Sequence, residues 1–208
     1  DALSRGLGDV YKRQEEDFYI CSMSSQTIIY KGLMLPNAID QFYIDIAKPN
    51  FEAKICLFHQ RFSTNTLPKW HLAQPFRLLA HNGEINAIRG NRNWARARQS
   101  KFSSPLIPKI DQFKDLVNET GSDSSALDNM IELLNKGGID LFRALRMVLP
   151  PAWQNVHSID QDLKAFHEYN SMHMEAWDGP AGIVLSDGRL AICSVSYTHL
   201  TLPTTLPV

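Results

Sequence analysis

This sequence predicts an α+β domain or a layered αββα arrangement, because strand-like segments lie near both ends and helical segments fill the middle. Runs of β-branched and aromatic residues at 17–21 and 26–30, separated by serines, are typical of a β-hairpin. A second hairpin is predicted from 181–185 and 190–194, which an Asp-Gly pair joins. Between the hairpins, amphipathic patterns with capping residues indicate helices.

The middle of the chain is expected to hold two more strands and five helices. Apolar runs bounded by polar residues predict strands at 54–59 and 78–81, the second ending on Asn82-Gly83. Ser122 or Asp123 can cap a helix that the Gly-Gly pair at 137–138 ends. The predicted helices span 36–46, 85–100, 124–135, 140–148 and 163–174.

The composition fits one ordinary soluble domain. The chain has 208 residues, of which 44% are hydrophobic and 21% charged, with a formal net charge of -1. This balance gives no reason to expect a nucleic-acid or membrane partner, and nothing marks secretion. Cys21, Cys56 and Cys193 are odd in number and lack a CxxC spacing, so we expect neither a disulfide framework nor a metal site. Reduced, mostly buried thiols in a cytoplasmic protein are the expectation.

The two ends look foreign to the domain. The segments 9–14 (DVYKRQ) and 195–200 (VSYTHL) are translations of the two strands of one inverted DNA repeat, of the kind that transposon-based library preparation leaves. We therefore expect residues 1–14 and 195–208 to be scars and residues 15–194 to be a partial domain. The alternative is a native N-terminal tail and a Thr/Pro-rich linker.

Three short segments place polar residues where catalysis could use them. Arg61 follows a predicted strand and precedes hydroxyl residues, so it can hold a carboxylate, or simply close a surface ion pair. Asn82 and Gly83 can aim a side-chain amide and a backbone N–H at one point, as an oxyanion hole requires, or can form a hairpin turn. Asp123 can accept an ammonium group or act as a helix cap.

Taken together, the motifs are similar to one known family. The order and spacing of HQRFSTNT, LLAHNGEINAIRGNRNW, GSDSSALDN and EAWDGPAGI resemble the glutaminase domain of glutamate synthases, a branch of the class-II glutamine amidotransferases. The resemblance implies the four-layer αββα sandwich of N-terminal-nucleophile hydrolases. It also implies an activity in which an N-terminal cysteine attacks the side-chain amide of L-glutamine, with the chain's own α-amine as base.

The resemblance assigns roles to five residues. Arg61, with the help of Thr64, is expected to bind the glutamine α-carboxylate, and Asp123 the α-ammonium group. Asn82 and Gly83 are expected to form the oxyanion hole. His59 and His81 are interpreted as packed, hydrogen-bonded residues, and the basic helix at 85–100 as a solvated face or a surface toward another domain of the parent.

No residue matches the family's nucleophilic cysteine, so we expect an internal fragment that does not hydrolyse glutamine by itself. The parent enzyme is expected to pass ammonia to 2-oxoglutarate on a synthase domain with FMN and an iron–sulfur cluster. A small NAD(P)H-oxidising subunit is a further expected partner, and a plastid location is an alternative in a photosynthetic source. The open alternatives are an amidotransferase of the amidophosphoribosyltransferase type and a glutaminase-like module that only binds.

Overall fold

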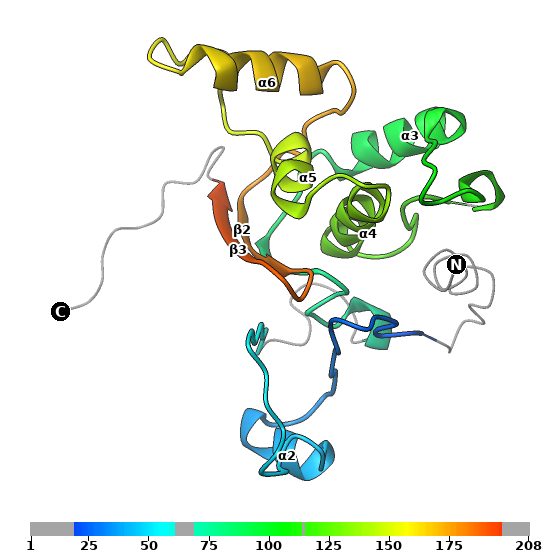
Figure 1. Cartoon of the computed structure of the whole chain (residues 1–208), viewed down its shortest axis with the longest axis vertical. Coiled ribbons are helices and arrows are strands. Elements are labelled where there is room, and N and C mark those ends of the chain that lie inside the picture. The colour runs from blue at the N-terminus through cyan, green and yellow to red at the C-terminus, as the bar shows by residue number, and fades with distance from the viewer. Residues whose placement is uncertain (1–18, 61–68, 114, 197–208) are drawn as a thin grey trace.

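The computed structural model describes residues 19–60, 69–113 and 115–196. Within these ranges, the α-helices and strands follow one another as one short helix, one strand, four helices and a closing hairpin (Figure 1). Their bounds are α2 Ile39–Phe42, β1 Leu79–Gly83, α3 Ile88–Arg98, α4 Asp123–Lys136, α5 Leu141–Val148, α6 Gln161–Ser171, β2 Ala181–Ser186 and β3 Ala191–Ser196. Short 3-10 turns lie at Pro36–Ala38, Trp70–Leu72, Gln99–Lys101 and Ile110–Gln112. Each helix among the described residues is too short or too polar to span a lipid bilayer.

The three strands form one antiparallel sheet in the order β1-β2-β3. Leu79 pairs with Leu185 and Gly83 with Ala181, so a strand from the middle of the chain joins the C-terminal hairpin. The predicted hairpin is confirmed, and Gly188 takes the positive φ (90°) that its turn requires. β3 runs two residues beyond the predicted boundary at 194, because β2 begins at Ala181 and pairs with Ser196.

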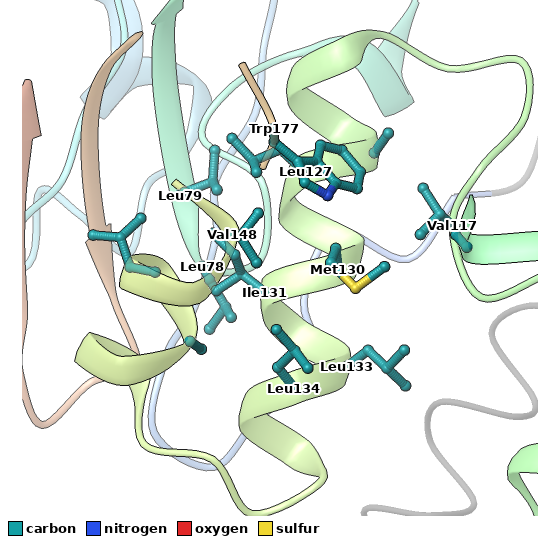
Figure 2. Packing of buried hydrophobic residues seen from close by; sticks show 14 of the residues in the cluster. Leu78, Leu79, Val117, Leu127, Met130, Ile131, Leu133, Leu134, Val148 and Trp177 are labelled. Atoms are coloured by element: carbon teal, nitrogen blue, oxygen red, sulfur yellow. The ribbon is translucent and has the colours of Figure 1, made fainter. Parts of the chain in front are cut away.

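Helix α4 is the centre of the core. Residues 124–134 are all buried, because the sheet, α5 and the loops around α4 cover it from every side. Leu127, Met130 and Ile131 pack among Leu79 of β1, Val148 of α5 and Trp177 (Figure 2). The sequence predicted α4 almost to the residue: Ser122 accepts a hydrogen bond from the Ser125 N–H as the cap, and the helix ends before Gly137. The predicted helices α3, α5 and α6 are likewise confirmed within a few residues.

A buried carboxylate joins α4 to β1. Asp128 accepts hydrogen bonds from three consecutive backbone N–H groups, those of Arg77 (3.2 Å), Leu78 (2.9 Å) and Leu79 (3.0 Å). One turn further along α4, Glu132 binds the Arg77 guanidinium at 3.0 Å. Burial raises the pKa of Asp128 to about 6, and the neighbouring Glu132 charge adds to this rise, while the backbone N–H groups and Arg77 oppose it.

A glutamine side chain completes the edge of β1 that faces away from β2. The Gln74 carboxamide accepts from the His81 N–H (2.6 Å) and donates to the His81 carbonyl (2.9 Å), as a neighbouring strand would. One pair earlier, the Leu79 carbonyl accepts from the Phe76 N–H at 2.8 Å. This side of β1 is therefore hydrogen-bonded from Leu79 to His81 without a second strand.

Two glycines permit a close approach between the end of β1 and the entry to β2. A Cβ built on Gly83 (φ 151°) would lie 1.9 Å from the Pro180 carbonyl oxygen, and one on Gly179 (φ 152°) would lie 1.9 Å from that of Glu84. Across this contact the Glu84 N–H donates to Pro180 at 2.9 Å. Any other residue at position 83 would therefore separate the two segments.

Two sequence predictions of strands are wrong within the described residues. Neither 19–30 nor 54–59 pairs with another strand, and residues 55–59 keep only the alternation of exposure that a strand would have. A strand needs a partner, and these segments instead leave large apolar side chains such as Ile28 and Phe58 exposed. The helix expected at 36–46 is shorter, a 3-10 turn followed by the single turn of α2.

The expectation of buried thiols is also wrong. All three cysteines are free, but Cys56 and Cys193 are exposed and Cys21 is partly exposed. Cys193 lies on the sheet face that the described helices do not cover, and Cys56 lies in the unpaired segment.

Replacing Asp128 is expected to change the free energy of unfolding in two ways, one through its charge and one through its hydrogen bonds. Because its folded pKa lies above that of an unfolded aspartate, the folded state holds its proton longer, so stability should fall as pH rises from about 4 to about 6. Asp128→Asn keeps an acceptor oxygen and should remove this slope. Asp128→Leu strands three N–H groups and should lower the free energy of unfolding by about 3 kcal/mol or more. Urea unfolding between those pH values measures both.

The exposed Asp111→Asn is the control for this experiment, expected within about 0.5 kcal/mol of the parent. A pH slope that survives in Asp128→Asn would contradict the assignment.

Adding one methyl group should change the stability of the chain in opposite directions at two glycines. Gly83→Ala collides with backbone and should destabilise the chain by about 2 kcal/mol or more. Gly90→Ala, inside α3 with nothing within 4 Å of the new Cβ, should stabilise it by about 0.5–1 kcal/mol. Thermal unfolding compares the two, and equal melting temperatures would refute the close approach at Gly83.

Candidate active site

The predicted site residues fall into two groups. Asn82 and Gly83 end strand β1, and Asp123 is the first residue of α4. Arg61 and Thr64 lie outside the described residues, so their placement stays a prediction. That Arg61, Asn82, Gly83 and Asp123 line one pocket likewise stays a prediction.

Asn82 and Gly83 lie within the strand and do not form a hairpin turn, because they pair with Gly182 and Ala181. In an antiparallel ladder, successive N–H groups point alternately toward and away from the partner strand. The Glu84 N–H points toward β2, where it binds Pro180, so the N–H groups of Leu79, His81 and Gly83 point away from it. Asp128 takes the first and Gln74 the second.

The third of these N–H groups, that of Gly83, has no hydrogen-bond partner among the described residues, and Gly83 is exposed. The Asn82 side chain is also exposed and makes no hydrogen bond to a described residue. Two donors on neighbouring residues are thus left available at the end of β1, which is the arrangement that an oxyanion hole needs.

Asp123 does more than begin a helix. Ser122 is the cap, and the Asp123 carboxylate reaches the segment after β1, where its Oδ2 accepts from the Ile85 N–H at 2.8 Å. Its Oδ1 lies 3.4 Å from the Ser124 hydroxyl. Since Ile85 is two residues beyond Gly83, the structure brings the first residue of α4 to the end of β1.

His81 is packed and hydrogen-bonded, as the sequence predicted. Its side chain is 2% exposed, and its Nδ1 lies 2.7 Å from the Ser124 hydroxyl of α4. Burial lowers the pKa of His81, whereas the nearby Asp123 carboxylate and the Pro180 carbonyl favour the protonated ring. His59 is half-buried and lies close enough for its charge to lower the pKa of His81 further.

Arg92 of α3 holds the loop before α4, although its helix was predicted to face solvent or another domain. The Arg92 guanidinium donates to the carbonyls of Asn118 (3.0 Å), Gly121 (2.7 Å) and Ser122 (3.3 Å). Arg98 on the same helix pairs with Glu175. These two side chains of α3 therefore bind their own chain, and Arg92 fixes the approach of Asp123 to the site.

Lys31 is a second residue that the sequence did not single out. It is 3% exposed, and its Nζ lies 4.7 Å from the centre of the Tyr19 ring and 5.1 Å from that of Phe76. Burial lowers the pKa of Lys31 to about 8. Because Phe76 precedes β1, this cluster lies at the opposite end of the strand from Gly83 and anchors the N-terminal arm there.

The sequence indicated only in part that Arg92 and Ser124 contribute to the site. Arg92 and Ser124 belong to the motifs RGNRNW and GSDSSALDN, but nothing in a motif tells which backbone atoms its side chains reach. No cluster of His, Cys, Asp and Glu in the described ranges is arranged to hold a metal ion.

Comparison with known proteins shows which sequences this chain is similar to. The sequence profile of the glutamine amidotransferases class-II matches residues 5–198. A ferredoxin-dependent glutamate synthase of Cyanidium caldarium is 45% identical over 187 residues, which is 89% of this chain and 12% of that protein. The glutamate synthase [NADH] of Saccharomyces cerevisiae is 44% identical over 177 residues, 84% of this chain and 8% of its own length.

The large chain of glutamate synthase [NADPH] from Bacillus subtilis gives 44% identity over 174 residues, 83% of this chain. The chain spans only 8 to 12% of the length of these relatives. Because the family profile covers nearly the whole chain and ends with the hairpin that carries β2 and β3, this chain belongs to the class-II glutamine amidotransferases.

Proposed function

We propose that this chain is part of a glutamate synthase and that its domain hydrolyses L-glutamine to glutamate and ammonia. The single observation that carries the proposal is the pair of unused donors, the Asn82 side-chain amide and the Gly83 N–H, at the end of β1 beside Asp123. The relatives named above, all glutamate synthases, support this function over an amidophosphoribosyltransferase or a module that only binds.

In the proposed reaction, the thiol of the family's N-terminal cysteine attacks the side-chain carbonyl of glutamine. The carbonyl oxygen becomes an oxyanion, which Asn82 and Gly83 stabilise by hydrogen bonds that strengthen as the charge develops. Ammonia leaves, and water then hydrolyses the thioester to glutamate through a second oxyanion at the same place. Arg61 and Thr64 hold the α-carboxylate, while Asp123 holds the α-ammonium group.

None of the three cysteines of this chain is proposed as the nucleophile. Cys193 lies on β3, and the whole of β2 separates it from β1, a distance of about 9–10 Å. Cys21 lies near Lys31, at the far end of β1. Cys56 is exposed and has no described hydrogen bond to a base. The nucleophile of the proposed reaction is the family's processed cysteine, upstream of the segments described here.

The complete domain is proposed to be the four-layer αββα sandwich of N-terminal-nucleophile hydrolases. The described sheet is covered by helices on one face, while the face that carries Cys193 remains partly exposed. A second sheet packed on the exposed face would bury it.

The rest of the parent enzyme is proposed to transfer the ammonia to 2-oxoglutarate with the help of FMN and an iron–sulfur cluster. A small NAD(P)H-oxidising subunit is a proposed partner. The scars at 1–14 and 195–208 also stay a proposal, since the family profile extends into both segments, and reading the source DNA across the junctions tests it.

Asn82→Ala in the complete enzyme tests the proposed function most sharply. Loss of one oxyanion donor should lower kcat for glutamine hydrolysis by about 10²–10³-fold while leaving KM nearly unchanged. Arg61→Lys is the matched contrast, because a point charge replaces a bidentate fork and should mainly raise KM. Steady-state glutaminase assays separate the two. A raised KM with intact kcat in Asn82→Ala would make Asn82 a binding residue and sink the oxyanion assignment.

A further inference from the structure

A buried hydrogen-bonded path runs from β1 to the carboxylate at the start of α4. The His81 Nδ1 lies 2.7 Å from the Ser124 Oγ, which in turn lies 3.4 Å from Oδ1 of Asp123. His81 and Ser124 are 2% and 6% exposed. The other carboxylate oxygen, Oδ2, already accepts the Ile85 N–H. Oδ1 is therefore the oxygen whose hydrogen bonding Ser124 can change.

The single hydroxyl proton of Ser124 can go to only one of its two neighbours. When the neutral His81 carries its proton on Nε2, Ser124 donates to Nδ1, and Oδ1 of Asp123 receives nothing from it. When His81 is doubly protonated, Nδ1 donates to Ser124, and the hydroxyl proton must turn to Asp123.

The other side of the imidazole ring favours these two states. Nε2 is buried and has no hydrogen-bond partner of normal geometry among the described residues. The Pro180 carbonyl oxygen lies beside it, since both atoms would contact a Cβ at Gly83, at 1.9 and 2.9 Å. A carbonyl at this place favours a proton on Nε2, in the neutral ring as well as in the charged ring.

We propose that His81 is a positioning residue for the glutamine site: through Ser124 it sets whether the α-ammonium group must share Oδ1 of Asp123 with the Ser124 hydroxyl, so that glutamine binding weakens when His81 is protonated. The inference rests on the proposed function, because it takes Asp123 as the acceptor of that group. Protonation acts twice in the same direction, since it turns the Ser124 hydroxyl proton toward one lone pair of Oδ1 and places a positive charge beside the carboxylate. By linkage, bound glutamine must make His81 harder to protonate.

The charged and titratable groups around His81 fix the pH range. Asp123 of α4 favours the protonated ring, whereas His59 from the preceding segment disfavours it. Burial is the largest influence and lowers the pKa of His81 below its ordinary value. The weakening of glutamine binding is therefore expected only in solution more acidic than the range in which an ordinary histidine titrates.

Histidine titration by NMR on the 208-residue chain tests the path itself. Asp123→Asn removes the favourable charge and Ser124→Ala removes the acceptor of the Nδ1 proton, so each should lower the pKa of His81 by about half a unit or more. Ser124→Thr keeps the hydroxyl and should restore the parent value. Ser125→Ala is the matched control, because its hydroxyl bonds to Asn118 and the Ser122 carbonyl instead of His81. If Asp123→Asn and Ser124→Ala behave like Ser125→Ala, the path does not exist.

Binding of L-glutamine and of 4-carbamoylbutanoate, which lacks the α-amine, tests the coupling to the substrate. The affinity for glutamine should fall by about 5-fold or more between about pH 7.5 and about pH 5, and the affinity for the analogue should not. An equal pH dependence for both ligands would overturn the proposal. Absence of glutamine binding at every pH would overturn the proposed function, while the histidine titrations would still decide whether the path exists.

Discussion

The position of β1, which ends with Asn82 and Gly83 of the candidate site, depends on one carboxylate, that of Asp128 on α4. It binds three backbone N–H groups where the chain enters β1, and so sets the depth and direction of this strand against the central helix. A buried carboxylate is destabilising unless its hydrogen bonds are made, and burial raises the pKa of Asp128 although the backbone N–H groups oppose this rise. The same interaction uses the Leu79 N–H, the first of the three that point away from β2.

The second of these N–H groups binds Gln74, and the third, that of Gly83, is left for a ligand. Along the edge of β1 that faces away from β2, the N–H groups of Leu79 and His81 thus have partners, whereas that of Gly83, the last, has none among the described residues. Gly83 suits this place because it has no side chain to collide with Pro180, and Asp123 reaches the same place from α4. A helix that is buried all round is a rigid support for such a site. Arg92 adds to this rigidity, because it holds the loop through three carbonyls.

Local sequence patterns predicted what local chemistry determines. The Ser122 cap, the Gly-Gly end of α4 and the Asp-Gly turn of the last hairpin act within a few residues, so the sequence alone located them. The strands expected within 19–30 and at 54–59 are absent because a strand depends on a partner, and apolar composition does not supply one. For the site, the motifs pointed to Asn82, Gly83 and Asp123. The contacts that place these residues, Asp128 with β1, Gln74 with His81 and Ser124 with His81, join positions 7 to 51 residues apart, and no spacing rule reveals them.

Amide hydrogen exchange along β1, followed residue by residue, tests the central claim most directly. If the N–H groups that face away from β2 are used in order, those of Leu79 and His81 should exchange slowly, whereas that of Gly83 should exchange at least about a hundredfold faster. Slow exchange of Gly83 to the same degree as Leu79 would mean that its N–H already has a partner. The donor on which the oxyanion assignment depends would then not be available.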